Sequence, residues 1–303
     1  MIRLFSSEFL RARSRRVLWV VVIGCSVATV LIVGYASIRS EPPNPLQGPA
    51  LEAYQQAQER CLQRASVPEG YTSREQFCAD QIRPEFFGGH DVLRFSSVVD
   101  LLKGGSFIVL ILALVLGASF IGADWHTGSM STILAWEPRR VRVLIVRAVI
   151  SGLMVLLMAV VLQAVLVASV WLGASLRGST DGLQQEFWRN VFETGGRVAA
   201  LAVLTSWIGI GLATIGRNTA AALGVMLGYV AVFEALFRGL NPSLARDLLI
   251  SNIAVVVDGR AQMIFSGRKV IELPLSRASW IVAIYAVATL AIGAVVFRTR
   301  DVT

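Results

Sequence analysis

The chain has 303 residues, of which 55% are hydrophobic and only 16% charged, whereas about 25% of the residues in an ordinary soluble domain are charged. This composition excludes a typical soluble enzyme or binding domain. The formal net charge of +8 comes mainly from dispersed arginines without interleaved aromatic residues, which argues against nucleic-acid binding.

Six apolar segments are long enough to cross a bilayer, because about 20 apolar residues span its hydrocarbon core as a helix. Backbone groups left without hydrogen bonds in lipid cost several kcal/mol each, so every one of these segments is predicted to be helical. We therefore expect an all-α membrane protein with six transmembrane helices, at Val17–Ala36, Leu101–Ala123, Ala148–Ala174, Val198–Ile215, Thr219–Phe237 and Trp280–Phe297.

The first span follows an arginine-rich stretch and has some features of a signal peptide. Its length of about 20 residues and the lack of a small-residue cleavage site favour an uncleaved span. Within residues 1–16, Ile2, Phe5, Phe9 and Ala12 recur on one helical face. This apolar stripe predicts an amphipathic helix in the cytoplasmic interface, which anchors the chain and is also placed to contact a cytoplasmic partner.

The distribution of arginine predicts the orientation of the spans. Basic residues gather in the first sixteen residues, in the segment 124–147, at Arg217 and in the tail after Phe297. Cytoplasmic loops carry the excess of Lys and Arg, so these segments are predicted to be cytoplasmic. The six-span domain, residues 17–303, then lies in the cell membrane with both termini in the cytoplasm.

The largest predicted extracytoplasmic insertion covers residues 37–100. Apolar residues recur at helical spacing between Leu51 and Ala65, and Thr72-Ser-Arg-Glu75 forms a capping box that predicts the start of a second short helix. These features predict a small helical hairpin outside the membrane.

Cys61 and Cys78 lie on the two predicted helices of this hairpin. A disulfide between them would close a loop of about 17 residues and contribute about 3 kcal/mol in the chain-entropy model. An oxidising outer compartment permits such a bond. The alternatives are two unpaired cysteines or a metal site with His90, although no paired-ligand spacing supports a metal site.

A second unusual outer segment is predicted at residues 238–278. Its apolar part, Leu244–Val257, is too short and too interrupted by polar residues to cross the bilayer, which fits a re-entrant or interfacial segment. An ordinary outer loop is the alternative interpretation. Gln262–Leu273 is predicted to form a small β-hairpin.

Small residues and ion pairs mark the later spans. Ala220, Gly224 and Gly228 form a ladder at four-residue spacing that lets helices approach closely, either within the chain or at a second copy or substrate path. The pair Glu234 and Arg238, like Glu193 and Arg197, is separated by four residues near a helix end. Structural pairing is favoured over a transport role for these charges.

Motifs for catalysis are missing from the sequence. There is no zinc-protease, nucleophile-elbow, Walker A or C-x-x-C pattern, so we expect neither an enzyme nor a cofactor or metal bound by this chain.

The polar segment 124–147 between the second and third spans is the most informative part of the sequence. A short helix is predicted at Thr127–Trp136, followed by a break at Pro138 and by Arg139 and Arg140. Asp124 lies just beyond the apolar end of the second span. Its charge is expected to favour the N-terminus of the short helix or to pair with a basic group of a partner.

The sequence resembles the ABC-2 family, the six-span transmembrane subunits of ABC exporters. The resemblance rests on the amphipathic helix before the first span, which corresponds to the family's elbow helix, and on the insertion between spans five and six. It also rests on the stretch from Gly122-Ala-Asp124-Trp through Thr127-Gly128 to Trp136-x-Pro138-Arg139-Arg140, and on the ending Phe297-Arg-Thr-Arg-Asp301. Family members commonly carry glutamate where this chain has Asp124.

The resemblance implies a permease that works with a second copy or a sister permease and with two separate ATPase subunits that bind ATP and Mg. The residues implied to couple permease and ATPase are Asp124, Thr127, Gly128, Arg139 and Arg140, and spans two and five are implied to line the transport path. The long apolar spans favour a hydrophobic or amphipathic cargo. The alternative function is a non-transporting membrane sensor or assembly factor whose cysteine hairpin binds a partner outside the cell.

Overall fold

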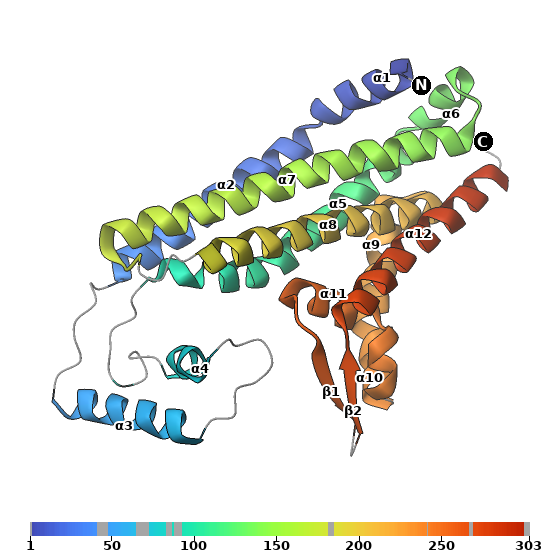
Figure 1. Ribbon diagram of the computed structural model, residues 1–303. Coiled ribbons are helices and arrows are strands. Elements are labelled where there is room, and N and C mark those ends of the chain that lie inside the picture. Colours follow the sequence, from blue (N-terminus) through green and yellow to red (C-terminus); the bar gives the residue numbers. More distant parts are fainter. Residues whose placement is uncertain are drawn as a thin grey trace. The chain divides into compact units, whose positions relative to one another are not determined.

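The computed structural model describes residues 2–40, 48–64, 73–82, 87, 93–180, 185–240, 242–266 and 269–299 (Figure 1). The chain divides into two compact units. The first comprises Met1–Ser26, Val99–Ala164 and Arg189–Thr303, and the second comprises Val27–Val98 and Val165–Trp188.

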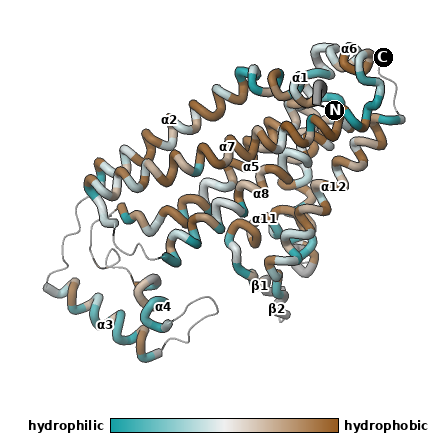
Figure 2. The backbone as a smooth tube through the Cα atoms, turned by 45° about the horizontal axis from the view of Figure 1, so that its top comes forward, coloured by the Kyte–Doolittle hydropathy of each residue, from teal (hydrophilic) through white to brown (hydrophobic). Residues whose placement is uncertain are grey.

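Within the described residues, six helices are long and apolar enough to cross a membrane, as predicted. They are α2 (Arg16–Arg39), α5 (Val98–His126), α7 (Arg140–Arg177), α8 (Gln185–Gly216), the run from α9 (Thr219–Gly228) through the π-helix η3 (Tyr229–Glu234) to α10 (Ala235–Leu240), and α12 (Leu275–Thr299). Figure 2 shows hydrophobic residues along these helices.

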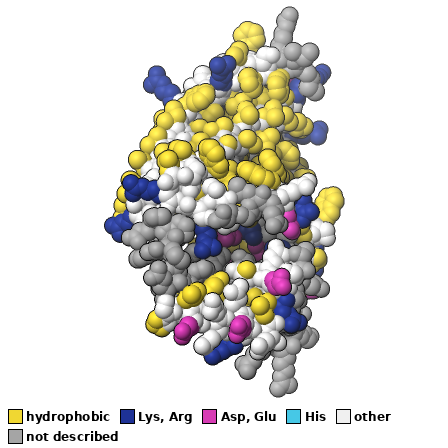
Figure 3. Space-filling view, turned by 60° about the vertical axis from the view of Figure 1, so that its left-hand side comes forward, with side chains coloured by type: hydrophobic (Ala, Val, Ile, Leu, Met, Phe, Trp, Pro, Cys, Tyr) yellow, Lys and Arg dark blue, Asp and Glu magenta, His cyan; other side chains and the backbone are white. Residues whose placement is uncertain are grey.

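The outer faces of these helices carry large apolar side chains. On α2 alone, Val20, Leu31 and Ile32 are about two-thirds exposed. Figure 3 shows hydrophobic side chains gathered over a continuous part of the surface. Soluble monomers rarely expose apolar patches of this kind, whereas a lipid-facing surface requires them.

The core of the first unit forms where α5, α7 and α8 pack with α12 and with α11 (Leu249–Asp258). Glycine allows α5 and α8 to approach closely. A Cβ on Gly209 would lie 2.5 Å from the carbonyl oxygen of Leu114, and one on Gly117 would overlap the backbone of Ser206. The small residues of α8 therefore serve packing within the chain.

The elements of the first unit are sorted toward two ends of its long helices. Helix α1 (Ile2–Arg13), helix α6 (Ser129–Trp136) and the end of α12 lie together at one end (Figure 1). The antiparallel hairpin of β1 (Gln262–Ser266) and β2 (Lys269–Leu273) lies at the other. The hairpin predicted at Gln262–Leu273 is confirmed. Helix α11 has ten residues, which is too short to cross a bilayer, and the 3₁₀ segment η4 (Pro242–Asp247) precedes it.

The second unit contains the predicted insertion. Helix α3 (Pro49–Arg64) and helix α4 (Arg74–Gln81) are joined by the Cys61–Cys78 disulfide, with a Cα–Cα distance of 5.8 Å. Ser73 is the N-cap of α4, since its side chain accepts a hydrogen bond from the backbone N–H of Gln76. The predicted capping residue, Thr72, lies outside the described residues. The short 3₁₀ turn η2 (Phe95–Ser97) leads into α5.

Candidate functional site

The N-terminal helix α1 packs on protein along its inner half. Phe9 and the buried Ala12 lie against an apolar cluster formed by Phe120 of α5 and residues of α7. Phe5 remains more than one-third exposed, and the side chain of Ile2 lies outside the described residues. The predicted apolar stripe is therefore partly buried, at Phe9 and Ala12, and partly exposed, at Phe5.

A buried cluster of charged side chains lies where α1 meets the ends of α5 and α7. At its centre is Asp124, which is 3% exposed, beside Arg147 of α7, which is 1% exposed. Asp124 Oδ2 lies 2.7 Å from Arg147 Nη1 as an ion pair whose geometry falls outside that of a hydrogen bond. Asp124 Oδ1 accepts a hydrogen bond from Arg11 Nη2 of α1 at 2.7 Å. The carboxylate thus connects three helices.

Two further side chains complete this charged cluster. Glu8 of α1 pairs with Arg147 at 3.4 Å. Arg15 donates to the carbonyl oxygen of Ser119 at 2.8 Å and lies 3.9 Å from Asp124 Oδ1. Burial lowers the pKa of the Arg15 guanidinium, and the nearby Asp124 carboxylate opposes that shift. Three guanidinium groups face two carboxylates here, so the cluster carries one net positive charge.

The turn from α5 to α6 is held by the same carboxylate. Ser129 Oγ donates to Asp124 Oδ1 at 3.2 Å, and the Thr127 hydroxyl donates to the Ala123 carbonyl at 3.1 Å. Gly128 has a φ of +69°, a left-handed conformation that glycine adopts without a steric penalty. The short helix begins at Ser129, two residues later than predicted, and its N-cap residue, Gly128, has no side chain with which to cap it.

The structure shows what surrounds Asp124 within the chain. This residue was predicted to cap the short helix or to meet a basic group of a partner. Its carboxylate is instead buried, and its ion-pair partners within the described residues are arginines of the same chain. Through these contacts it links α6 to α1 and α7.

The two predicted basic residues after α6 have different surroundings. Arg140 Nη1 donates to the carbonyl oxygen of Phe297 at 3.2 Å, near the C-terminus of α12, where the last carbonyls lack partners within the helix. Arg139 is exposed. Trp136, at the end of α6, is 87% exposed and is the most exposed large hydrophobic residue of that helix. Arg139 and Trp136 are therefore the exposed cationic and aromatic side chains between Thr127 and Arg139, where Thr127 and Gly128 are exposed as well.

Sequence reasoning missed Glu8, Arg11 and Arg147 as members of this cluster. Arg147 carried a signal, because it interrupts an apolar run, and a fully buried arginine requires a carboxylate partner. Glu8 was the second signal, as the single acid among the first sixteen residues.

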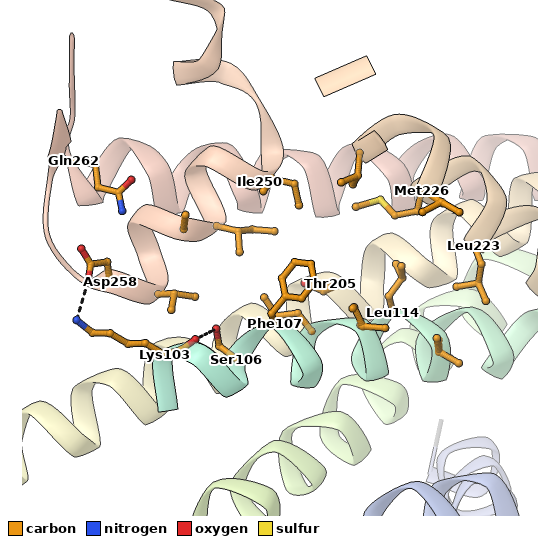
Figure 4. A pocket seen from close by; sticks show the side chains of 18 residues that line it. Lys103, Ser106, Phe107, Leu114, Thr205, Leu223, Met226, Ile250, Asp258 and Gln262 are labelled. Atoms are coloured by element: carbon orange, nitrogen blue, oxygen red, sulfur yellow. Dashed lines mark hydrogen bonds and ion pairs between the residues drawn. The ribbon is translucent and has the colours of Figure 1, made fainter. Parts of the chain in front are cut away.

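A cavity of about 690 Å³ lies on another side of α5 (Figure 4). Its walls come from α5, α8, α9, η3 and α11, so the helices of spans two and five both line it, together with Gln262 of β1. A second cavity of about 460 Å³ shares Val230 and Ile250 with the first and extends along η3 to Glu234 and Arg238.

The small-residue ladder of α9 does not pack within the described chain. Ala220, Gly224 and Gly228 are exposed, and no atom would lie within 4 Å of a Cβ on either glycine. Of the alternatives left open by the sequence, packing within the chain is not seen for these residues in the described part of the structure, because α9 turns this face outward. The face is therefore open to lipid or to a second copy.

Both predicted charge pairs at helix ends are formed in the structure. The buried Glu234 Oε1 accepts a hydrogen bond from the backbone N–H of Ile250 at 2.9 Å, in the first turn of α11, and Glu234 Oε2 lies 3.5 Å from Arg238. The carboxylate supplies the cap that α11 lacks from its own residues. Arg197 and Glu193 are 3.7 Å apart.

No group of three or more His, Cys, Asp or Glu side chains that could hold a metal ion occurs among the described residues. Cys61 and Cys78, two ligands of the alternative metal site, are joined to each other. The third, His90, lies outside the described residues.

Comparison of the sequence with protein-family models gives no match, and comparison with curated proteins gives none either.

Proposed function

We propose that this chain is the permease subunit of an ATP-driven exporter of the ABC-2 type, energised by a separate ATP-binding subunit. The observation that carries the proposal is the buried ion-pair cluster at Asp124. It joins α1, α5 and α7 and fixes the turn into α6. A short surface helix transmits force to membrane spans only if it is rigidly attached to them, and this cluster provides such an attachment.

The exposed residues of the α6 segment supply a docking surface for the ATPase. Trp136 combines a large apolar area with high exposure, and the exposed Arg139 adds a positive charge. Aromatic and arginine side chains dominate binding energy at protein interfaces. We place this surface, the two termini and α1 as an elbow helix on the cytoplasmic side, in keeping with the excess of arginine there.

In this proposal, movement of the ATPase subunits is transmitted to the cavity through a single helix, α5. Closure of the ATPase subunits displaces α6, and the Asp124 cluster passes that displacement to α5. Residues nearer the start of the same helix line the 690 Å³ cavity. The α11 and β1–β2 segment then serves as the outer re-entrant element, and the exposed ladder of α9 faces a second permease copy.

Affinity purification from native membranes in a mild detergent tests this function. Tagged full-length protein should bring down an ATP-binding subunit, identified by mass spectrometry from its Walker A peptide. Combining Trp136→Ala with Arg139→Glu should reduce the recovered ATPase about tenfold, because two interface anchors are lost. Arg177→Glu, an equal charge reversal at the other end of α7, should leave the recovery unchanged.

Two results would contradict the proposal. The first is recovery of no ATP-binding protein with the wild-type chain. The second is full recovery with the double variant. A protein bound through α3 and α4 in place of an ATPase would support the membrane sensor or assembly factor.

A further inference from the structure

The 690 Å³ cavity is charged at one end and largely apolar along the rest of its length, where Ser106 and Thr205 are the polar lining residues. Lys103, Asp258 and Gln262 form the polar end, whereas Leu114, Leu223 and Met226 lie toward the other (Figure 4). On α5 the lining residues run from Lys103 to Val115, which corresponds to about 18 Å of helix. The cavity therefore has the length and polarity of an amphiphile with one hydrocarbon tail region.

The polar end carries charges of both signs. Lys103 Nζ donates to Asp258 Oδ1 at 2.7 Å, and both side chains remain partly exposed, at 27% and 40%. Lys103 lies within two turns of the start of α5, which is the depth at which a lipid headgroup meets the end of a span. A ligand with both a negative and a positive group can pair with Lys103 through the first and with Asp258 through the second. Two new ion pairs then replace the original one, and neither residue is left without an opposite charge.

Thr205 of α8 supplies a second, independent indication of a ligand. It is 5% exposed and lines the cavity, and its hydroxyl has no hydrogen-bond partner among the described residues. A buried hydroxyl without a partner is costly, which makes it a candidate donor to a ligand. The carbonyl oxygen of an acyl ester could accept a hydrogen bond from this hydroxyl.

We infer that the cavity binds a zwitterionic diacyl lipid, with its phosphate at Lys103, its ammonium group at Asp258 and its acyl chains against α5, α9 and α11. An anionic lipid has no positive group to pair with Asp258. An uncharged lipid leaves the Lys103–Asp258 ion pair in place and forms no ion pair of its own. The inference rests on the proposed function only in so far as this lipid is the cargo, because binding itself needs no ATPase.

Native mass spectrometry of the purified full-length protein in a maltoside detergent tests the inference. The probes are three lipids with identical ten-carbon chains: a phosphoethanolamine, a phosphoglycerol and an uncharged diacylglycerol. Wild-type protein should bind the phosphoethanolamine lipid about tenfold more tightly than the other two, because it alone matches both charges.

Two charge variants distinguish recognition of the headgroup from non-specific lipid binding. Asp258→Asn should bind the phosphoglycerol lipid as tightly as the phosphoethanolamine lipid, because Lys103 is then available to a phosphate without a neighbouring carboxylate. Lys103→Gln should weaken binding of the phosphoethanolamine lipid, because its phosphate loses its partner, while Asp258 continues to disfavour the phosphoglycerol lipid. Equal binding of all three lipids by the wild-type protein would overturn the inference.

A steric variant locates the binding site. Ala254→Phe on α11 places a ring in the cavity and should weaken phosphoethanolamine binding about tenfold. Ala288→Phe is the matched control, at an exposed position of α12 that does not line the cavity. Unchanged binding to Ala254→Phe would place the lipid elsewhere and overturn the inference. These results are independent of ATPase recovery, so either proposal can fail alone.

Discussion

At the scale of single residues, the pairing of Asp124 and Arg147 is the most consequential feature. Both side chains are almost fully buried, and each has a further partner on α1: Arg11 for the carboxylate and Glu8 for the guanidinium. Desolvation of such charges offsets much of their attraction, so the intact pair adds little net stability. Removal of one partner, however, leaves the other charge buried and uncompensated.

Asp124→Ala should therefore destabilise the purified protein. Loss of the central carboxylate costs about 3–5 kcal/mol and lowers Tm by about 10 °C in a thermal unfolding assay. Arg147→Met should have a smaller effect, because Asp124 retains Arg11. The double variant Asp124→Ala/Arg147→Met should recover part of the loss, since an apolar pair replaces a buried ionic one.

Arg139→Ala is the control for this series, because Arg139 is exposed and should leave Tm unchanged. An unaltered Tm for Asp124→Ala would show that the cluster does not hold α1, α5 and α7 together.

At the scale of elements, α3 and α4 illustrate how a covalent link supports short helices. Helix α4 has eight residues, and isolated helices of this length are marginal in water. The Cys61–Cys78 disulfide joins it to α3, and an N-cap hydrogen bond at Ser73 satisfies one of its free N–H groups.

We expect Cys61 and Cys78 to be oxidised in protein isolated without reductant, while Cys25 remains a thiol. Alkylation before and after reduction, followed by peptide mass spectrometry, measures this directly. Replacement of both cysteines by serine should make α3 and α4 more susceptible to limited proteolysis, because the cross-link contributes about 3 kcal/mol. Alkylation of Cys61 and Cys78 in the unreduced protein would contradict this expectation.

At the scale of the whole molecule, the arrangement of charges predicts how the chain lies in the membrane. Helix α1, helix α6 and the end of α12 lie at one end of the first unit (Figure 1), and the chain in or directly beside these elements carries Arg3, Arg11, Arg13, Arg15, Arg139, Arg140 and Arg298. From the positive-inside rule we predict that this end faces the cytoplasm.

Tag accessibility in intact cells tests this orientation. A tag after Thr303 and one inserted after Arg139 should be protected from an impermeant reagent, whereas one inserted after residue 68 should react. Reaction at Thr303 with protection at residue 68 would invert the topology and remove α6 from the side where ATP is available.

The sequence alone determined the elements whose physical causes are local. Six apolar runs had to become helices, because their backbone groups have no other partners in lipid. The hairpin at Gln262–Leu273 followed from local pattern and turn residues. The span that became α7 was predicted to begin at Ala148, directly after the basic segment 124–147. The helix in fact begins at Arg140.

Only the tertiary structure decided which ion pairs Arg11, Arg147 and Asp124 form. Arg11 and Asp124 are 113 positions apart in sequence, and Glu8 and Arg147 are 139 apart. No local pattern relates them, since their contact depends on how α1 packs against α5 and α7. The same holds for the outward face of the α9 ladder. Which side of a helix is buried depends on its neighbours, and only packing places those neighbours.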